Sequence, residues 1–329
     1  MELHVVYASD DNYAPYMGIS MYSLLKNNSN CFDKIHVYVL DNGIGTKNHA
    51  RLEKQAAVFD NVELVVHPIS QEIQAIRPKY ETGWSNSVFG RYFIDDIVKE
   101  GVDNLLYLDC DTIVNRSLKE LFALDISDYY AAGVIDGLSQ AQMDYLQLDA
   151  GGTYVNSGVL LINVNRWKGE GIGKKLIEYV NSFDRRLIYP DQDAFNAVCG
   201  QSLLRLPLKY NCFQTMDFDY IDTYVKKDNP PYSYEELIEA MADDCAGTVI
   251  FHFTGGKPWN KSESCPRFER LFTQYAKQSY WSHIRPKFRN LSLAFKYYHL
   301  KAVMNMYELA RRIVGDRFYN SMKQKFKGE

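Results

Sequence analysis

Two carboxylates end an apolar stretch in the middle of the chain. Residues 105–108 read Leu-Leu-Tyr-Leu, and Asp109 and Asp111 follow with only Cys110 between them. In an extended backbone, side chains two positions apart point the same way, so both carboxylates can face one cation while Cys110 points elsewhere. The pair predicts a metal site at the end of a buried strand, where open α/β sheets bind ligands. The alternative is an Asx turn ahead of a capping box at residues 117–120.

A second polar stretch ends an apolar run late in the chain. His252 lies at the end of that run and precedes Gly255, Gly256 and Lys257. Imidazole beside two carboxylates makes His252 the natural third ligand and favours Mn²⁺, with Mg²⁺ as the second choice. Glycines let the backbone approach a phosphate and lysine adds a point charge, so this loop predicts a diphosphate site. The alternatives are a simple turn and a histidine without a ligand role.

A rigid sheet has to position these side chains, and the hydrophobic pattern indicates one. Apolar runs alternate with helix-like segments, which is typical of a parallel, doubly wound α/β sheet. Acidic residues such as Asp191 in the first turn of an expected helix suit the positive end of its dipole. We expect strands at residues 3–8, 34–40, 62–67, 105–108, 130–136, 155–162 and 248–253, and helices at 15–27, 46–59, 87–99, 139–148, 165–183 and 191–198.

Composition is that of an ordinary globular protein. The 329 residues suffice for one large α/β domain with an appendage, or for two domains. A net charge of −4 excludes a globally basic nucleic-acid-binding protein. The six cysteines form no Cys-x-x-Cys pair, the chain opens on a strand-like run instead of a signal peptide, and no apolar run is long enough to span a bilayer. We therefore expect a reduced, cytoplasmic protein.

Taken together, the motifs resemble the retaining glycosyltransferases of family 8, and within it the bacterial lipopolysaccharide galactosyl- and glucosyltransferases. The resemblance covers about residues 1–260. It implies a GT-A fold, which is a Rossmann-like, mostly parallel sheet flanked by helices, with a UDP-galactose or UDP-glucose donor and a divalent cation, commonly Mn²⁺. The motifs are, in chain order, Tyr7-Ala-Ser-Asp-Asp-Asn-Tyr13, Phe89-Gly-Arg-Tyr92, Leu106-Tyr-Leu-Asp-Cys-Asp111, Val155-Asn-Ser-Gly-Val-Leu-Leu-Ile-Asn163, Pro190-Asp-Gln-Asp193, His252-Phe-Thr-Gly255 and Lys257-Pro-Trp259.

The resemblance also implies a role for individual positions. It assigns the uracil and ribose to Ala8, Asp10, Asn12 and Cys110. It assigns the cation to Asp109, Asp111 and His252, and the diphosphate to Gly255 and Lys257. It assigns the transferred sugar to Arg91, Asp136, Asn156, Asp191 and Gln192, with Asp136 nearer the acceptor. Two simpler interpretations stay open: a turn at Asp136 and a first-turn helix carboxylate at Asp191.

The implied chemistry is hexose transfer with retention of configuration. A nucleotide sugar already has a good leaving group, so the enzyme must mainly neutralise charge that grows on the diphosphate. The amide of Gln192 is a poor nucleophile. We therefore favour attack by the acceptor on the face that the diphosphate leaves, with a donor phosphate oxygen helping to deprotonate the acceptor. Asp191 and Gln192 would stabilise an oxocarbenium-like state.

Two other functions share parts of this pattern. A nucleotidyltransferase also joins carboxylates, a metal and a nucleotide, but it is expected to carry a glycine-rich phosphate loop after the first strand. Here the first glycine is Gly18, inside an expected helix. A non-catalytic sugar-nucleotide-binding membrane scaffold is disfavoured because all three candidate metal ligands are present.

The C-terminal part of the chain differs in charge from the rest. Residues 283–329 contain 11 Lys and Arg against three acidic residues, a net charge of +8, which leaves −12 for the rest. We expect a catalytic GT-A domain at 1–260 and a helical, basic, amphipathic segment at 261–329. Such a segment suits the anionic inner face of the cell membrane, where a glycan or glycolipid acceptor such as lipopolysaccharide is anchored. The alternative is a helix pair that packs on the catalytic domain.

Overall fold

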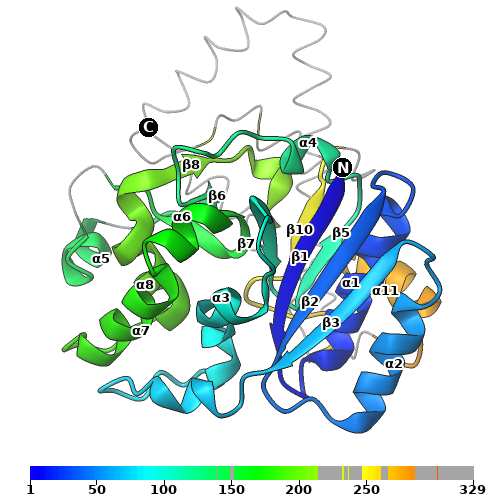
Figure 1. Ribbon diagram of the computed structural model, residues 1–329, viewed down its shortest axis with the longest axis horizontal. Coiled ribbons are helices and arrows are strands. Elements are labelled where there is room, and N and C mark those ends of the chain that lie inside the picture. The colour runs from blue at the N-terminus through cyan, green and yellow to red at the C-terminus, as the bar shows by residue number, and fades with distance from the viewer. Residues whose placement is uncertain are drawn as a thin grey trace, which may run out of the picture.

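The computed structural model describes residues 1–138, 140–148, 152–213, 232, 236, 247–260, 266–285 and 302. Its centre is a seven-stranded sheet in the order β3-β2-β1-β4-β7-β6-β8 (Figure 1). Only β7 runs against its neighbours in this sheet, so the mostly parallel α/β arrangement is confirmed. The strands are β1 (Glu2–Ser9), β2 (Lys34–Asp41), β3 (Val62–Pro68), β4 (Asn104–Leu108), β6 (Ala131–Ile135), β7 (Val155–Asn163) and β8 (Leu203–Arg205).

Helices cover both faces of the sheet (Figure 1). One face carries α1 (Ala14–Asn28), α2 (Thr46–Ala56), α4 (Lys119–Phe122) and α11 (Pro266–Gln278). The other carries α3 (Ile94–Ile97), α6 (Val164–Gly169), α7 (Ile172–Ser182) and α8 (Pro190–Cys199). The short helix α5 (Gln140–Tyr145) lies in the connection from β6 to β7.

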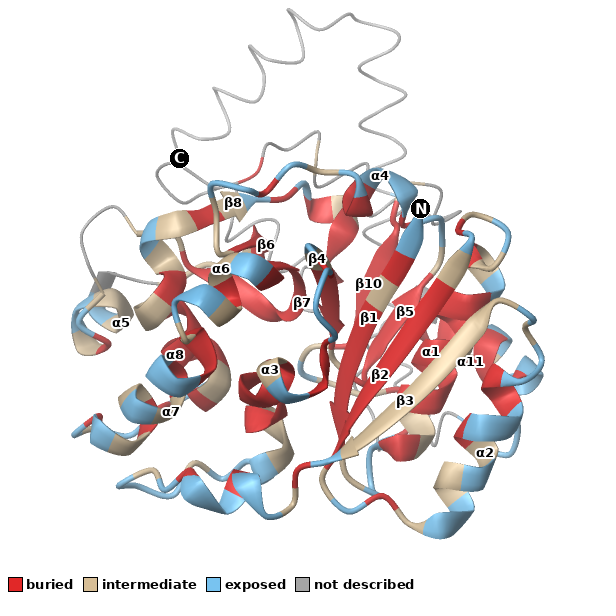
Figure 2. Ribbon diagram, in the orientation of Figure 1, coloured by how far each residue is buried: buried red, intermediate tan, exposed pale blue. Residues whose placement is uncertain are grey.

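The central strands are buried on both faces (Figure 2). In β1, Val5 and Tyr7 belong to the apolar cluster on the α1 side, whereas Val6 and Ala8 belong to the cluster on the α7 side. A strand with two apolar faces shows a continuous hydrophobic run instead of alternation. This is why the runs that mark these strands in the sequence predict their positions well.

A small second sheet, in the order β5-β10-β9, holds the end of the loop that carries Asp109 and Asp111. Its strands are β5 (Thr112–Val114), β9 (Cys212–Phe213) and β10 (Ile250–His252). β10 pairs antiparallel with β5, so His252 lies opposite Thr112, directly after Asp111. The sequence predicts β10 because this strand lies inside the longer apolar run at residues 248–253. It does not predict β5 and β9, which have three and two residues and lie in no such run.

Two expected helices differ in the structure. The helix expected at 87–99 is a 3₁₀ segment, Asn86–Phe93, followed by the single turn of α3. Gly90 of that segment lies against β1, and an added Cβ would be 2.4 Å from the Cβ of Ala8. The helix expected at 165–183 is divided into α6 and α7. The break is at Gly171, whose φ of +62° favours glycine.

The chain after α11 is anchored on α1. Trp281 is fully buried, and a Cβ added at Gly18 would be 2.0 Å from its ring. The indole Nε1 also donates to Asn48 Oδ1 on α2, at 3.3 Å. The sheet core therefore includes residues up to Trp281 at least, whereas the division at residue 260 stays a prediction.

Of the helical segment expected at 261–329, residues 266–285 are described and include α11, whereas the basic tail from residue 286 onward lies outside the described residues, apart from Ala302. Its helical structure therefore stays a prediction from sequence. Within the described ranges, none of the helices has both the length and the apolar character needed to cross a membrane.

Candidate active site

A pocket of about 530 Å³ opens at the edge of the sheet where β1 and β4 end and β7 begins. Sites for small molecules commonly have this size. Asn12 is exposed and lies outside the lining, so its assignment stays a prediction. The other residues predicted from sequence all line the pocket: Ala8, Asp10, Arg91, Asp109, Cys110, Asp111, Asp136, Asn156, Asp191, Gln192, His252, Gly255 and Lys257.

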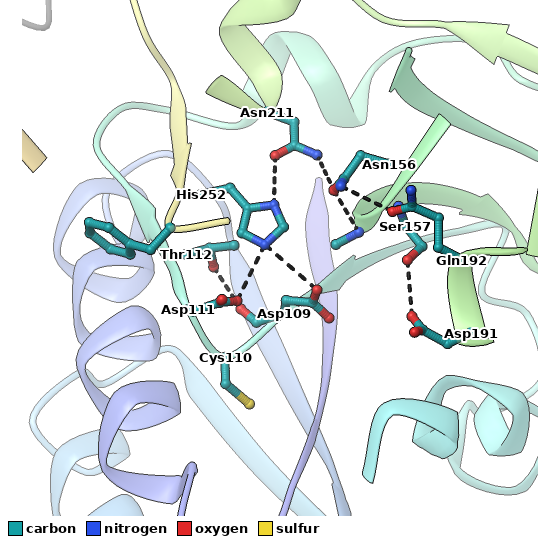
Figure 3. A network of polar contacts seen from close by, with 12 residues as sticks. Asp109, Cys110, Asp111, Thr112, Asn156, Ser157, Asp191, Gln192, Asn211 and His252 are labelled. Atoms are coloured by element: carbon teal, nitrogen blue, oxygen red, sulfur yellow. Dashed lines mark hydrogen bonds and ion pairs between the residues drawn. The ribbon is translucent and has the colours of Figure 1, made fainter. Parts of the chain in front are cut away.

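Asp109, Asp111 and His252 converge on one side of this pocket (Figure 3). Nε2 of His252 lies 3.3 Å from Asp111 Oδ1 and 3.7 Å from Asp109 Oδ2. One ligand atom from each residue lies within 4.8 Å of the other two, which is a spacing that one divalent cation can bridge. Cys110 points away from them, as the i, i+2 argument predicts, and its thiol donates to the Ala8 carbonyl at 3.1 Å.

Backbone hydrogen bonds hold the two acidic residues in place. The Asp109 N–H donates to the Gly158 carbonyl on β7 at 2.8 Å, and the Phe253 N–H donates to the Asp111 carbonyl at 2.9 Å. The Thr112 hydroxyl donates to the Asp109 carbonyl at 2.9 Å. Two segments that lie far away in the sequence, at Gly158 and Phe253, therefore help to fix the loop between β4 and β5, together with the local bond from Thr112.

Lys257 pairs with one of these two carboxylates, that of Asp111. It forms an ion pair with Asp111 and donates to the Phe253 carbonyl at 2.6 Å. Burial alone would raise the pKa of Asp111, but Lys257 and His252 hold that pKa below its ordinary value. The Asp111 carboxylate therefore stays ionised. Two carboxylates and an imidazole are a donor set that fits Mn²⁺ or Mg²⁺. Gly255 has a φ of +75°, which explains a glycine in this turn.

Arg91 is a buried cation at the centre of the site. Its guanidinium lies 2.7 Å from Asp191 Oδ2, 3.1 Å from Asp109 Oδ1 and 4.2 Å from the centroid of the Tyr107 ring. Burial alone would lower the pKa of Arg91, but Tyr107, Asp191 and Asp109 raise it above the ordinary value. Burial also raises the pKa of Asp191, against the influence of Arg91. Arg91 thus connects Asp109, one of the candidate metal ligands, to Asp191.

The start of β7 organises the opposite side of the pocket (Figure 3). The Gln192 carbonyl oxygen accepts from Asn156 Nδ2 at 3.0 Å and from the Ser157 N–H at 3.1 Å, and its amide nitrogen donates to Asp136 at 3.0 Å. The Ser157 hydroxyl donates to Asp191 at 3.0 Å. The side chains of Asp136, Asp191 and Gln192 are therefore held in one network.

The loop after β1 forms the far end of the pocket. Asp10 accepts hydrogen bonds from the hydroxyls of Ser85 and Ser87, at 2.9 and 3.2 Å. Its neighbour Asp11 turns the other way and accepts from the Gly45 N–H at 2.8 Å. Tyr13 adds an aromatic ring to the lining and is 39% exposed, so its face is available to a flat ligand.

Two further aromatic side chains lie at the pocket mouth. Trp84 and Tyr189 both line the pocket, yet they are 51% and 44% exposed. Their ring centroids are 6.4 Å apart, and Trp84 Nε1 donates to the Ile188 carbonyl at 3.1 Å. Exposed apolar surface beside a pocket is typical of a ligand-binding groove.

Glu2, His4 and His36 form a second group of potential ligands within the described ranges, at the other end of β1 and β2. The two imidazole rings are stacked, with centroids 4.4 Å apart and planes 7° from parallel. The lone pairs of ring nitrogens lie in the ring planes, so two stacked rings cannot direct them at one ion. His36 Nε2 instead lies 2.7 Å from Glu2 Oε2. We interpret this group as a hydrogen-bonded cluster without a metal.

Three residues that shape the site have weak signals in the sequence. Ser157 and Gly158 belong to an Asn-Ser-Gly start of an otherwise apolar strand, and that polar start is the signal that marks them. Asn211 contacts both His252 and Asn156, but it precedes a two-residue strand and follows no apolar run.

Comparison with known proteins agrees with this geometry. A lipopolysaccharide 1,2-glucosyltransferase of Escherichia coli is 31% identical over 263 residues, 78% of this chain and 73% of that protein. General stress protein A of Bacillus subtilis is 29% identical over 287 residues, 86% of this chain and 96% of that protein. The crystal structure of the galactosyltransferase LgtC with donor and acceptor sugar analogs superimposes with a TM-score of 0.70 at 26% identity, covering 85% of this chain and 96% of LgtC.

The sequence profile of glycosyl transferase family 8 matches residues 4–263, which contain every residue of the pocket. The expected GT-A architecture is confirmed by the likeness to LgtC. This chain belongs to glycosyl transferase family 8.

Proposed function

We propose that this protein is a metal-dependent retaining hexosyltransferase. It would move galactose or glucose from a UDP-sugar to a glycan or glycolipid acceptor, such as lipopolysaccharide or another surface polysaccharide. The observation that carries the proposal is the convergence of Asp109, Asp111 and His252 in one pocket with Asp191 and Gln192. The names of the lipopolysaccharide 1,2-glucosyltransferase and of LgtC, which was solved with donor and acceptor sugar analogs, support the substrate classes.

Asp109, Asp111 and His252 would hold the cation, Mn²⁺ or in second place Mg²⁺. When bound, it supplies a Lewis acid that stabilises negative charge on the diphosphate leaving group. Lys257 would contribute a second positive charge to the same group, because its ammonium already lies beside Asp111. Gly255, also in the lining, would let the backbone approach the phosphates.

The nucleoside would bind between β1 and the 3₁₀ segment Asn86–Phe93. Asp10 offers a carboxylate to ribose hydroxyls, Ala8 leaves room beside the base, and Tyr13 offers an aromatic face. Cys110 lies in the same wall, with its thiol directed at β1. Its burial raises the pKa of the thiol, so Cys110 stays neutral and acts as a small apolar side chain.

Retention would follow from attack on the face that the diphosphate leaves. The Gln192 carbonyl oxygen already accepts two hydrogen bonds, from Asn156 and Ser157, so it is held in place and poorly available as a nucleophile. Asp191 is held by Arg91 and Ser157, and its carboxylate would stabilise positive charge on the sugar ring. Both residues are then stabilising groups, and neither forms a covalent intermediate.

The acceptor would enter at the mouth, over Trp84 and Tyr189, and reach Asp136. The two exposed rings offer apolar faces to a sugar, and Asp136 offers a carboxylate to its hydroxyls. Both Gln192 and Asn156 donate to Asp136, so the network that holds the donor sugar also positions the acceptor group.

A donor panel tests this proposal. Purified protein is incubated with nucleotide sugars and Mn²⁺, and hydrolysis is measured with and without excess chelator. We expect turnover of UDP-galactose or UDP-glucose, loss of turnover in chelator, and recovery when Mn²⁺ is restored. Transfer to a suitable acceptor should give an α-linked product by NMR. Full activity in chelator would contradict the metal site, and a β-linked product would contradict retention.

The tail supports a second part of the proposal, a peripheral location at the cytoplasmic face of the membrane. Its net charge of +8 favours anionic lipid, at about 1 kcal/mol per basic residue near the surface. Full-length protein should co-sediment with anionic vesicles at low salt and be released at high salt. A chain ending at Arg285, which retains the buried Trp281, should stay in the supernatant yet still hydrolyse its donor. Equal sedimentation of both chains would disprove attachment through the tail.

A further inference from the structure

We propose that Asn211 is a positioning residue that fixes the tautomer of His252. It holds the proton on Nδ1, so that Nε2 presents its lone pair to the cation. This inference rests on the proposed metal-dependent function. It concerns a residue that neither touches the cation nor belongs to the motifs of the chain.

The orientation of each amide follows from a backbone donor (Figure 3). The Gly158 N–H donates to Asn156 Oδ1 at 3.0 Å, and a backbone nitrogen can only donate. The atom of Asn156 at that position is therefore the oxygen. Asn211 approaches the same oxygen at 3.0 Å, so it does so with its amide nitrogen. The Asn211 carbonyl oxygen then faces His252.

The proton position on His252 follows from this orientation. Asn211 Oδ1 lies 3.1 Å from His252 Nδ1, and an amide oxygen can only accept. Nδ1 must therefore carry a proton, which leaves Nε2 as the ring nitrogen that can bind a cation. Nε2 is the nitrogen that faces Asp109 and Asp111, at 3.7 and 3.3 Å. A hydrogen bond to the other ring nitrogen is the usual device by which proteins orient a metal-binding histidine.

Burial makes this arrangement hard to reverse. Asn211 is fully buried, and Asn156 and His252 are 6% and 4% exposed, so water has little access to replace a lost partner. Turning the Asn211 amide would set its oxygen against Asn156 Oδ1 and its nitrogen against the Nδ1 proton. Each buried polar group left without a partner costs about 1–3 kcal/mol. The apolar Phe213 ring also packs against the imidazole, with its centroid 6.1 Å from that of His252, and it offers no hydrogen bond in place of Asn211.

The same chain of amides reaches the sugar side of the pocket. Asn156 donates through Nδ2 to Gln192 Oε1 at 3.0 Å, so Asn211 and Asn156 connect the metal ligand to the residues around the sugar. A change at Asn211 should therefore weaken cation binding first, because His252 is its direct partner.

The first test is NMR of metal-free protein labelled with ¹⁵N-histidine. The spectrum of His252, assigned by its loss in His252→Gln, should show a proton on Nδ1. A ring whose proton is on Nε2 alone would overturn the inference. This measurement needs no metal, so it remains decisive even if the proposed metal-dependent function fails.

The second test is Mn²⁺ affinity measured by calorimetry on Asn211→Leu. The variant removes the acceptor from Nδ1 at similar volume, and we expect affinity to fall about 10–100-fold. Asn163→Leu is the matched control, because Asn163 is a buried asparagine at the end of β7 that lies away from the pocket, bonded to the Ile126 and Ser127 carbonyls. It should lower stability without changing Mn²⁺ affinity. Wild-type affinity in folded Asn211→Leu would overturn the positioning role, whereas absence of Mn²⁺ binding in the wild type would overturn the proposed function.

Discussion

Replacing Gly158 by alanine should abolish cation binding and lower hexose transfer at least about 100-fold, the equivalent of about 3 kcal/mol. An added Cβ would be 2.2 Å from Cε1 of His252 and 2.6 Å from Oδ2 of Asp109, much closer than carbon atoms approach in proteins. His252 is 4% exposed and its Nδ1 is held by Asn211, so its ring has little room to withdraw. A single methyl group would therefore displace two of the three candidate ligands.

The measurements are Mn²⁺ binding by calorimetry, transfer rate, and thermal unfolding of the same preparation. Gly169→Ala is the control, because no atom lies within 4 Å of its added Cβ and the residue ends helix α6. We expect the control to keep wild-type binding and activity. If Gly158→Ala folds and binds Mn²⁺ with wild-type affinity, the three residues do not form the metal site.

Trp281→Ala should lower the free energy of unfolding by about 3–5 kcal/mol, the usual range when a buried tryptophan is truncated in a core. The ring fills the space above Gly18 on α1, and its Nε1 joins α2 through Asn48. Its removal leaves a cavity between the first two helices and the segment after α11. Because the free energy of unfolding of many proteins is only about 5–15 kcal/mol, a fraction of the variant molecules should be unfolded at temperatures that the wild type withstands.

Urea unfolding followed by circular dichroism measures this loss. Tyr280→Ala is the matched control: the neighbouring aromatic ring is 45% exposed, and we expect a change of less than about 1 kcal/mol. Chains ending at residues 279 and 285 extend the comparison, and only the longer one should unfold cooperatively. Equal stability of Trp281→Ala and the wild type would show that Trp281 does not anchor the segment after α11.

The sequence predicts those parts of the site that follow long apolar runs. Asp109 ends the run of β4 and His252 ends the run of β10, and in both cases the strand end gives the position of the side chain. Because side chains alternate along an extended backbone, the sequence also predicts that Cys110 points away from Asp109 and Asp111. Local periodicity is enough for these features because each depends on one strand.

Features that depend on contacts between distant segments are not predictable in this way. A strand buried on both faces carries no mark of its direction, so the antiparallel course of β7 is invisible in its run of apolar residues. The polar loop at residues 10–12 shows the same limit: Asp10 points into the pocket, Asp11 turns to Gly45 and Asn12 faces solvent. Successive residues of a turn diverge, so the loop is predicted correctly whereas the direction of each side chain is not.

The antiparallel course of β7 also bears on how this family diversifies. Because β6 ends and β7 starts at the same edge of the sheet, the connection between them leaves and returns beside the pocket. Its base is tied where the Asp136 N–H donates to the Tyr154 carbonyl at 3.0 Å. The entropic cost of closing a loop rises only slowly with its length. The fold should therefore tolerate longer or shorter segments between β6 and β7. A change in this connection would thus alter one wall of the pocket while the strands that carry Asp109 and His252 stay the same.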